Sequence, residues 1–125
     1  MVLGSGGASK AVQFVLKQRG IGFKIVSRSV NSNFITYEEL TNEMIKEHQL
    51  IINTTPLGMQ PHTELYPSIP YLALTTQHYL YDLIYNPAKT LFLQKGEEMG
   101  AAIQNGAEML VIQAEESWKI WNELI

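Results

Sequence analysis

The chain has 125 residues, a formal net charge of −3 and no cysteine. This length supports one domain with a single hydrophobic core. The slight acidic excess argues against a broad nucleic-acid-binding surface, which needs clustered lysine and arginine, and the lack of cysteine excludes disulfides and cysteine-ligated metals. No apolar run approaches the roughly twenty residues that span a bilayer, and the N-terminus lacks the pattern of a signal peptide. We therefore expect a cytoplasmic protein that contacts neither membranes nor nucleic acids.

The first 20 residues have the pattern of a strand, a glycine-rich turn and a helix. Residues 1–3 are apolar and precede Gly4, Ser5, Gly6, Gly7 and Ala8. Apolar residues then recur at helical spacing, namely Ala11, Val12, Val15 and Leu16. This order predicts a pyrophosphate site, because glycine lets backbone N–H groups approach the phosphates and a helix N-terminus attracts an anion. A glycine turn without a ligand is the alternative.

Only three residues precede Gly4, fewer than a typical strand contains. We therefore expect the chain to begin inside its first strand, as a domain cut from a longer protein would.

The rest of the chain alternates between predicted strands and helices. Further strands are expected over residues 23–27, 49–53, 79–84 and 101–104. Helical segments are expected over residues 36–47, 71–74, 90–99 and 107–124, and the last has an apolar stripe of Leu110, Val111, Ala114, Trp118, Trp121 and Leu124. Residues 28–33 and 60–70 are expected to be loops. The alternation predicts one domain, residues 1–125, with a Rossmann-type doubly wound, mainly parallel α/β sheet in three αβα layers.

Ser27, Arg28 and Ser29 follow the second predicted strand, where a dinucleotide fold meets the adenosine ribose of its cofactor. An acidic residue there suits the 2′-hydroxyl of NAD, whereas arginine suits the 2′-phosphate of NADP. The next acidic residue is Glu38. The Arg28 guanidinium can clamp a phosphate in a bidentate manner, with the flanking hydroxyls as further donors. The position predicts an NADP site, and a solvated loop arginine is the alternative.

Five motifs in order resemble those of the shikimate dehydrogenase family. They are GSGGASK from Gly4, SRS from Ser27, INTTPLGM from Ile52, YDLIYNPAKT from Tyr81 and GAEMLVIQ from Gly106. Each motif is weak alone, but together they cover the chain. The resemblance is to the C-terminal, NADP-binding half of these enzymes. It implies the reversible reduction of 3-dehydroshikimate to shikimate in aromatic amino-acid (chorismate) biosynthesis by the whole enzyme.

The resemblance also implies roles for individual residues. The loop of Gly4, Ser5, Gly6, Gly7 and Ala8 would hold the pyrophosphate. Arg28 and Ser29 would take the 2′-phosphate, with Ser27 beside them in the cofactor site. Thr55 and Leu83 would line the cofactor cleft, and the backbone of Gly106 would meet the nicotinamide amide. Tyr85 and Gln113 would reach the shikimate.

Some residues depart from the family pattern. Ser32 stands where the family often has a second basic residue, and Lys10 stands where its glycine loop usually ends in arginine. Glu108 replaces a glycine, and its carboxylate would disfavour an anionic substrate nearby unless it turns to solvent. His48, His62 and His78 lack metal-ligand spacing, so we predict no metal site.

The family's catalytic lysine and aspartate lie in an N-terminal domain that this chain lacks, so we assign no catalytic residue. We expect the chain to bind NADP(H) without turning over shikimate. Apolar surface left bare near Tyr85, Pro87 and the last helix favours a homodimer. Two alternatives stay open: a stand-alone, non-catalytic NADP-binding module, and a quinate/shikimate dehydrogenase domain.

Overall fold

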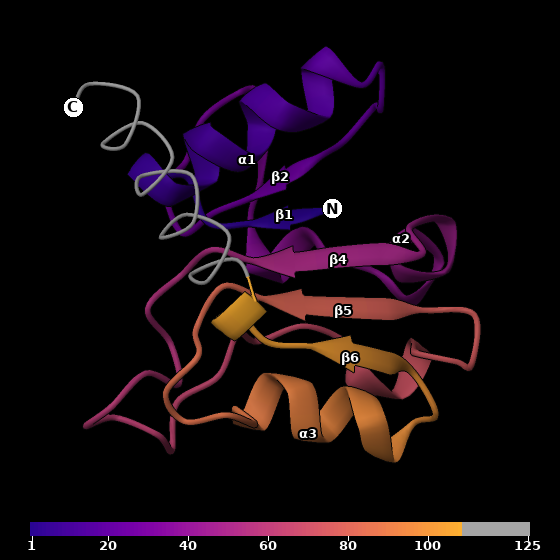
Figure 1. The fold of residues 1–125 in the computed structure, drawn as a ribbon. Helices are drawn as coiled ribbons and strands as arrows, with labels where there is room; N and C mark the ends of the chain where they lie inside the picture. Colours follow the sequence, from indigo (N-terminus) through magenta and orange to yellow (C-terminus); the bar gives the residue numbers. More distant parts are fainter. Residues whose placement is uncertain (109–125) are drawn as a thin grey trace, which may run out of the picture.

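A six-stranded, all-parallel sheet forms the centre of the molecule (Figure 1). The computed structural model describes residues 1–108. The strands are β1 (Val2–Leu3), β2 (Ile25–Val26), β3 (Phe34–Ile35), β4 (Leu50–Asn53), β5 (Tyr79–Asp82) and β6 (Ala102–Gln104). Their spatial order is β3-β2-β1-β4-β5-β6, and every neighbouring pair is parallel. The strand order reverses between β1 and β4, which is the topology of a doubly wound α/β fold. The predicted fold is confirmed.

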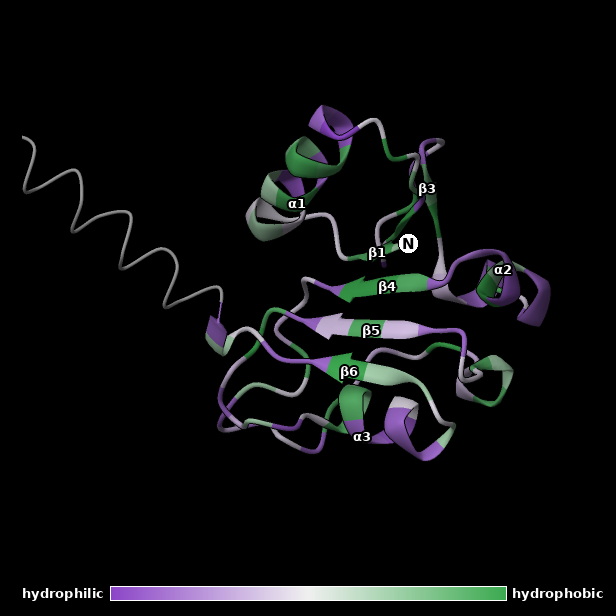
Figure 2. Ribbon diagram, turned by 45° about the vertical axis from the view of Figure 1, so that its right-hand side comes forward, coloured by the Kyte–Doolittle hydropathy of each residue, from purple (hydrophilic) through white to green (hydrophobic). Residues whose placement is uncertain are grey.

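Helices cover both faces of the sheet. The α-helices are α1 (Gly7–Gln18), α2 (Asn42–Glu47) and α3 (Leu91–Glu98), and the 3₁₀ helices are η1 (Tyr37–Glu39) and η2 (Tyr71–Ala73). Leu3, Ile51 and Leu80 point toward α2 and α3 and join the larger core. Their neighbours Val2 and Ile52 point to the opposite face and pack with Leu16 of α1. Because side chains alternate along a strand, apolar residues of the central strands lie on both faces of the sheet. Figure 2 colours β1 and most of β4 as hydrophobic.

Threonine side chains cap the N-termini of α2 and α3. Thr41 Oγ1 accepts a hydrogen bond from the Met44 N–H at the start of α2. Thr90 Oγ1 does the same for the Leu93 N–H at the start of α3. Each satisfies a backbone donor that the helix itself leaves without a partner.

The structure differs from the sequence prediction in several strands, and β5 ends at Asp82 rather than at residue 84. Residues 34–35 form the edge strand β3, which was not predicted, because two apolar residues in a polar stretch give no strand pattern. Pairing with β2 forms this strand, and the Ser27 N–H donates to the Ile35 carbonyl beside it. In addition, β2 covers two of the five residues predicted.

The predicted helix over residues 107–124 lies outside the described residues except for Ala107 and Glu108, which are helical. Its apolar stripe, including Trp118 and Trp121, lies outside them entirely. Within residues 1–108, no helix has the length and apolar character needed to cross a membrane.

Candidate functional site

The glycine loop joins β1 to α1 and leaves the start of the helix open. Gly4 has a φ of +108°, and a Cβ atom there would lie 2.6 Å from Thr54 Oγ1. Gly6 is the N-cap of α1, and neither a side-chain cap nor an acidic residue occupies its first turn. Gly6, Gly7 and Ala8 are exposed. This end of α1 therefore offers backbone N–H groups and a partial positive charge to an anion.

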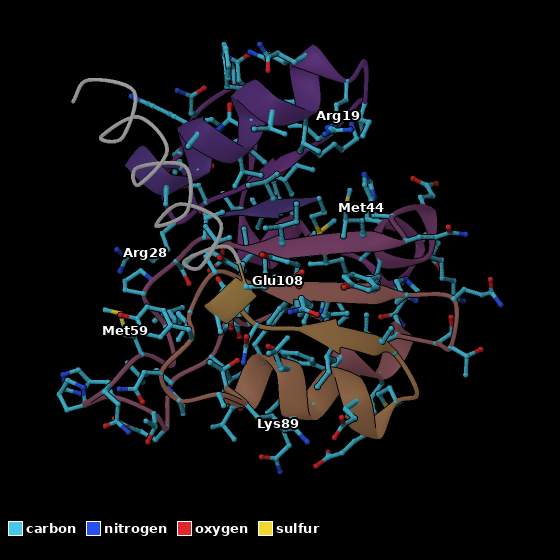
Figure 3. All side chains as sticks on the ribbon, in the orientation of Figure 1. Arg19, Arg28, Met44, Met59, Lys89 and Glu108 are labelled. Carbon is cyan, nitrogen blue, oxygen red and sulfur yellow. The ribbon has the colours of Figure 1, made fainter. Side chains whose placement is uncertain are left out.

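A second loop, after β2, lies beside the glycine loop and is hydrogen-bonded to it. The Oγ atoms of Ser5 and Ser27 are 2.8 Å apart, and Ser27 Oγ also accepts from the Ser29 N–H at 3.1 Å. Ser27 is buried, whereas Arg28 and Ser29 are exposed. In Figure 3 the Arg28 side chain projects outward beyond the carboxyl ends of the strands. Ser27 therefore braces the two loops, and its neighbours face solvent.

These two loops and the segment after β4 enclose a hollow of about 360 Å³. It is lined by Gly4, Ser5, Gly6, Ser27, Arg28, Ser29, Tyr37, Thr54, Thr55, Pro56 and Leu57. Burial raises the pKa of the Tyr37 hydroxyl, and the positive charge of Arg28 opposes that rise. The hollow thus combines an exposed guanidinium, hydroxyl groups and the open end of α1, which is the donor set that phosphate groups require.

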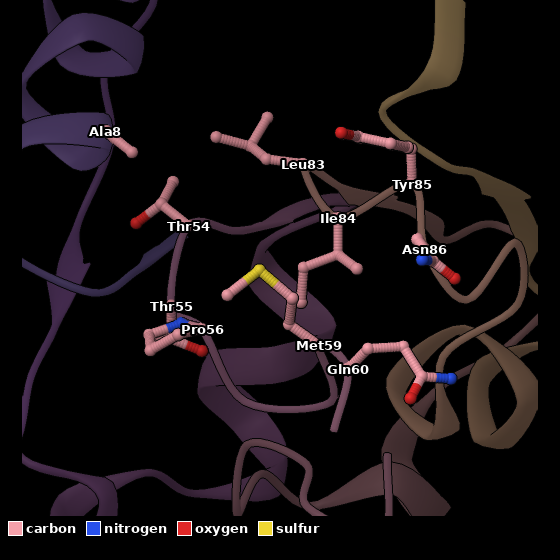
Figure 4. A pocket seen from close by; sticks show the side chains of 10 residues that line it. All are labelled: Ala8, Thr54, Thr55, Pro56, Met59, Gln60, Leu83, Ile84, Tyr85 and Asn86. Carbon is pink, nitrogen blue, oxygen red and sulfur yellow. The ribbon is translucent and has the colours of Figure 1, made fainter. Parts of the chain in front are cut away.

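A second hollow of about 450 Å³ adjoins the first (Figure 4). It is lined by Ala8, Thr54, Thr55, Pro56, Met59, Gln60, Leu83, Ile84, Tyr85 and Asn86. Thr54, Thr55 and Pro56 line both hollows and form the wall between them. In this second hollow the structure brings together Ala8, Thr55, Leu83 and Tyr85, which the sequence assigned to the cofactor and substrate.

Hydrogen bonds fix the shared wall to the sheet. The backbone N–H and the Oγ1 of Thr54 both donate to the Leu3 carbonyl, at 2.9 and 2.6 Å. The N–H and Oγ1 of Thr55 both donate to Asn53 Oδ1, at 3.1 and 2.7 Å. The wall is therefore held by the last residues of β1 and β4.

Asp82, at the end of β5, is fully buried and accepts three hydrogen bonds. Its Oδ1 accepts from Asn53 Nδ2 at 3.2 Å and from the Ile84 N–H at 3.0 Å, and its Oδ2 accepts from Thr90 Oγ1 at 2.7 Å. Burial raises the pKa of this carboxyl group, and the three hydrogen bonds oppose the rise.

Gly106 follows β6 and packs against the main chain of Leu83 so closely that no Cβ atom would fit. Its N–H donates to the Ile84 carbonyl at 3.1 Å. Gly106 and Gly7 are not among the residues that line the two hollows, although each adjoins one that is. Gln113 lies outside the described residues.

Lys10, Ser32 and Glu108, which depart from the family pattern, do not line either hollow. Glu108 is exposed and lies near Tyr81, where its charge adds to the effect of burial in raising the pKa of that tyrosine. Ser32 lines a separate hollow with Lys17 and Lys24. Lys10 is exposed and lines neither of the two hollows.

The three histidines lie on separate segments and make local contacts. His78 is buried, accepts at Nδ1 from the Thr75 N–H and places Nε2 2.8 Å from the Ile45 carbonyl oxygen. His48 Nδ1 lies 2.7 Å from the Met44 carbonyl oxygen, and His62 lies 3.7 Å from Glu64.

Several residues that line the two hollows have no role predicted from the sequence: Tyr37, Thr54, Pro56, Leu57, Met59, Gln60, Ile84 and Asn86. Most of them belong to the two motifs that follow β4 and β5, so the motifs themselves were the available signal. Tyr37 gave no such signal, because its place at the hollow depends on β3.

Two features together define the class of this protein. The sheet has the strand order of a dinucleotide-binding fold, and the two hollows lie where the strand order reverses, at the carboxyl ends of the strands. By its architecture the chain has a Rossmann-type, doubly wound α/β fold, a fold that often binds dinucleotides.

Comparison with known proteins shows which proteins the chain is similar to. The chain matches no protein-family model. It is 38% identical over 135 residues to the shikimate dehydrogenase (NADP(+)) of Methanococcus maripaludis, an alignment that covers 97% of this chain and 48% of that protein. It is 41% identical over 133 residues to the same enzyme of Clostridium beijerinckii, and this alignment covers 98% of this chain and 48% of that protein.

A solved structure shows the same relationship. The shikimate 5-dehydrogenase of Thermus thermophilus, in complex with NADP(H) and shikimate, matches with a TM-score of 0.81 at 29% identity, covering 99% of this chain and 49% of that one. The chain is a homologue of the shikimate dehydrogenases, as its five motifs predict. It spans about half the length of the curated relatives it matches.

Proposed function

We propose that this chain is the NADP(H)-binding, C-terminal half of a shikimate dehydrogenase, whose other half carries the catalytic groups. The complete enzyme would reversibly reduce 3-dehydroshikimate to shikimate in chorismate biosynthesis. The names of the curated relatives and the NADP(H) complex of the Thermus thermophilus enzyme support this proposal.

The observation that carries the proposal is the convergence of the glycine loop and Arg28 in one hollow. A pyrophosphate would sit at the N-terminus of α1, against the backbone of residues 4–8. The 2′-phosphate would take the Arg28 guanidinium and the Ser29 donors. Ser27 would act indirectly, because its hydroxyl already braces the two loops. No acidic side chain lines this hollow within the described chain, which favours the 2′-phosphate over a free 2′-hydroxyl.

The second hollow would then receive the nicotinamide. Leu83 and Thr55 would line it, and the backbone of Gly106 would meet the carboxamide through its carbonyl, because the Gly106 N–H already bonds to Ile84. Tyr85 is 52% exposed at this hollow and would reach the substrate together with Gln113. The nicotinamide supplies the hydride, and this chain binds and orients it. Proton transfer would come from the missing half.

Because this chain would bind the cofactor and the other half would carry the catalytic groups, the isolated chain should have only part of the enzyme's properties. It would bind NADP(H) but form no NADPH from shikimate and NADP. Met59 and Tyr85 expose 47% and 52% of their surface beside the second hollow, and this apolar surface would favour a homodimer when the other half is absent. Sedimentation at high concentration tests the dimer. We also propose that the protein is cytoplasmic, which cell fractionation would test.

A cofactor titration tests the proposal. The purified chain is titrated with NADPH and with NADH while the nicotinamide fluorescence is followed. We expect preference for NADPH, and Arg28→Ala should weaken NADPH binding by about ten- to a hundredfold, since it removes a charged hydrogen-bonding partner. Arg19→Ala is the matched control, because Arg19 is also exposed but lies at the far end of α1.

Other outcomes separate the alternatives. Equal binding of NADH and NADPH, unaffected by Arg28→Ala, would overturn the NADP assignment and favour an NAD-dependent quinate/shikimate dehydrogenase. Shikimate-dependent NADPH formation by the pure chain would contradict the missing catalytic half. An adjoining reading frame with no substrate domain would favour a stand-alone binding module.

A further inference from the structure

The ends of β4 and β5 carry a polar pair that lies beneath the second hollow. Asn53 and Asp82 are register partners in the parallel β4–β5 ladder, and both are fully buried. Their side chains are joined by the Asn53 Nδ2 to Asp82 Oδ1 hydrogen bond. Neither side chain lines either hollow.

From this pair, hydrogen bonds run to both sides of the second hollow. On the β4 side, Asn53 uses its amide N–H₂ for Asp82 and its Oδ1 for the N–H and hydroxyl of Thr55. Because the amide group cannot turn without losing all three bonds, Asp82 fixes which atom Asn53 presents to Thr55. On the β5 side, Asp82 Oδ1 holds the N–H of Ile84 directly.

The surroundings of Asp82 indicate that its carboxylate is a fixed hydrogen-bond acceptor rather than a group that reacts. All three of its partners donate to it, so the ionised carboxylate satisfies every one of them. Within residues 1–108 the ion pairs are His62–Glu64 and Lys89–Glu97, so no cationic side chain pairs with this buried carboxylate. A buried charge held only by hydrogen bonds is costly to keep, and stabilising the fold does not by itself require one.

We propose that Asp82 is a positioning residue for the nicotinamide half of the site: through Asn53 it holds Thr55, and directly it holds the backbone of Ile84, so that the two sides of the second hollow stay in register. It touches no ligand itself. This inference rests on the proposed function, because it assigns the second hollow to the nicotinamide.

The test compares the whole cofactor with its adenosine end. NADPH fills both hollows, whereas 2′,5′-ADP carries the 2′-phosphate and one phosphate of the pyrophosphate but no nicotinamide. Asp82→Asn keeps the size of the side chain and places an N–H₂ group where an acceptor is needed. We expect it to weaken NADPH binding about tenfold and to change 2′,5′-ADP binding less than about twofold. The fluorescence of bound NADPH should also shift, because its nicotinamide loses a fixed wall.

A second pair of variants covers the case in which Asp82→Asn does not fold. Thr90→Val removes one donor to Asp82 together with the N-cap of α3, and Thr41→Val removes only the N-cap of α2. Both variants lose a helix cap, so they should be destabilised to a similar degree. Only Thr90→Val should weaken the binding of NADPH relative to the binding of 2′,5′-ADP.

The outcomes are distinct. A selective loss of NADPH affinity in Asp82→Asn or Thr90→Val supports the positioning role. An equal loss for both ligands, or no loss, refutes it and makes Asp82 a purely structural residue. If the unmodified chain binds neither ligand, the proposed function fails; if it binds 2′,5′-ADP but not NADPH, the adenosine assignment stands and the nicotinamide assignment, with this inference, falls.

Discussion

Replacing Gly4 by alanine tests whether the glycine loop is fixed by its contact with the wall between the hollows. At a φ of +108° the new Cβ would lie 2.6 Å from Thr54 Oγ1 and 3.1 Å from Thr55 Cγ2. The strained backbone costs about 1–3 kcal/mol. Displacing Thr54 from the Leu3 carbonyl adds about 0.5–1.5 kcal/mol. We therefore expect Gly4→Ala to lower the free energy of unfolding by about 1.5–4.5 kcal/mol.

Gly20→Ala provides the control, because Gly20 also has a positive φ, +69°, but no atom lies within 4 Å of its would-be Cβ. In this variant, backbone strain alone should lower the free energy of unfolding, by about 1–2 kcal/mol. Urea unfolding of the two variants and the unmodified chain measures the difference. The reasoning is wrong if Gly4→Ala is no less stable than Gly20→Ala, because the contact with Thr54 would then cost nothing.

Two further predictions concern hydrogen bonds near the hollows. Ser27→Ala removes the brace between the glycine loop and the Arg28 loop, so NADPH affinity should fall about threefold to tenfold by titration, while Ser32→Ala, in a separate hollow, should leave it unchanged. The raised pKa of Asp82 means that the folded chain binds its proton more readily than the unfolded chain, so this group's contribution to stability falls as the pH rises above 3.8. Relative to Asp82→Asn, the unmodified chain should therefore gain stability as the pH falls from 7 toward 4; urea unfolding across that range measures it, and a difference independent of pH would contradict the shift.

The sequence was sufficient for the architecture because strands and helices alternate clearly. Parallel strands end at one edge of the sheet, so loops far apart in the chain, such as those at Gly4, Arg28 and Thr55, were expected to meet there. The structure brings these three residues into one hollow. Their roles toward a cofactor stay predictions.

What the sequence did not show depends on contacts between distant segments. The two-residue strand β3 exists through its pairing with β2, and Tyr37 reaches the hollow only because β3 leads to it. The burial of Ser27 and its hydrogen bonds to Ser5 and Ser29 were likewise not visible in the sequence, which predicted Ser27 only as a donor in the cofactor site. Glu108 was expected to disfavour a nearby anion unless it turned to solvent; it is exposed, lies near Tyr81 and lines neither hollow.

In the loop after β2, the residue that makes the hydrogen bonds is a different one from the residue that faces the open hollow. Ser27 carries the hydrogen bonds and is buried, while Arg28 next to it is exposed. Surface substitutions away from such bonds usually change stability by less than about 0.5 kcal/mol. Under the proposed function, a change of the amino acid at Arg28 would therefore alter coenzyme preference without lowering the stability of the fold, because the hydrogen bonds of this loop belong to Ser27.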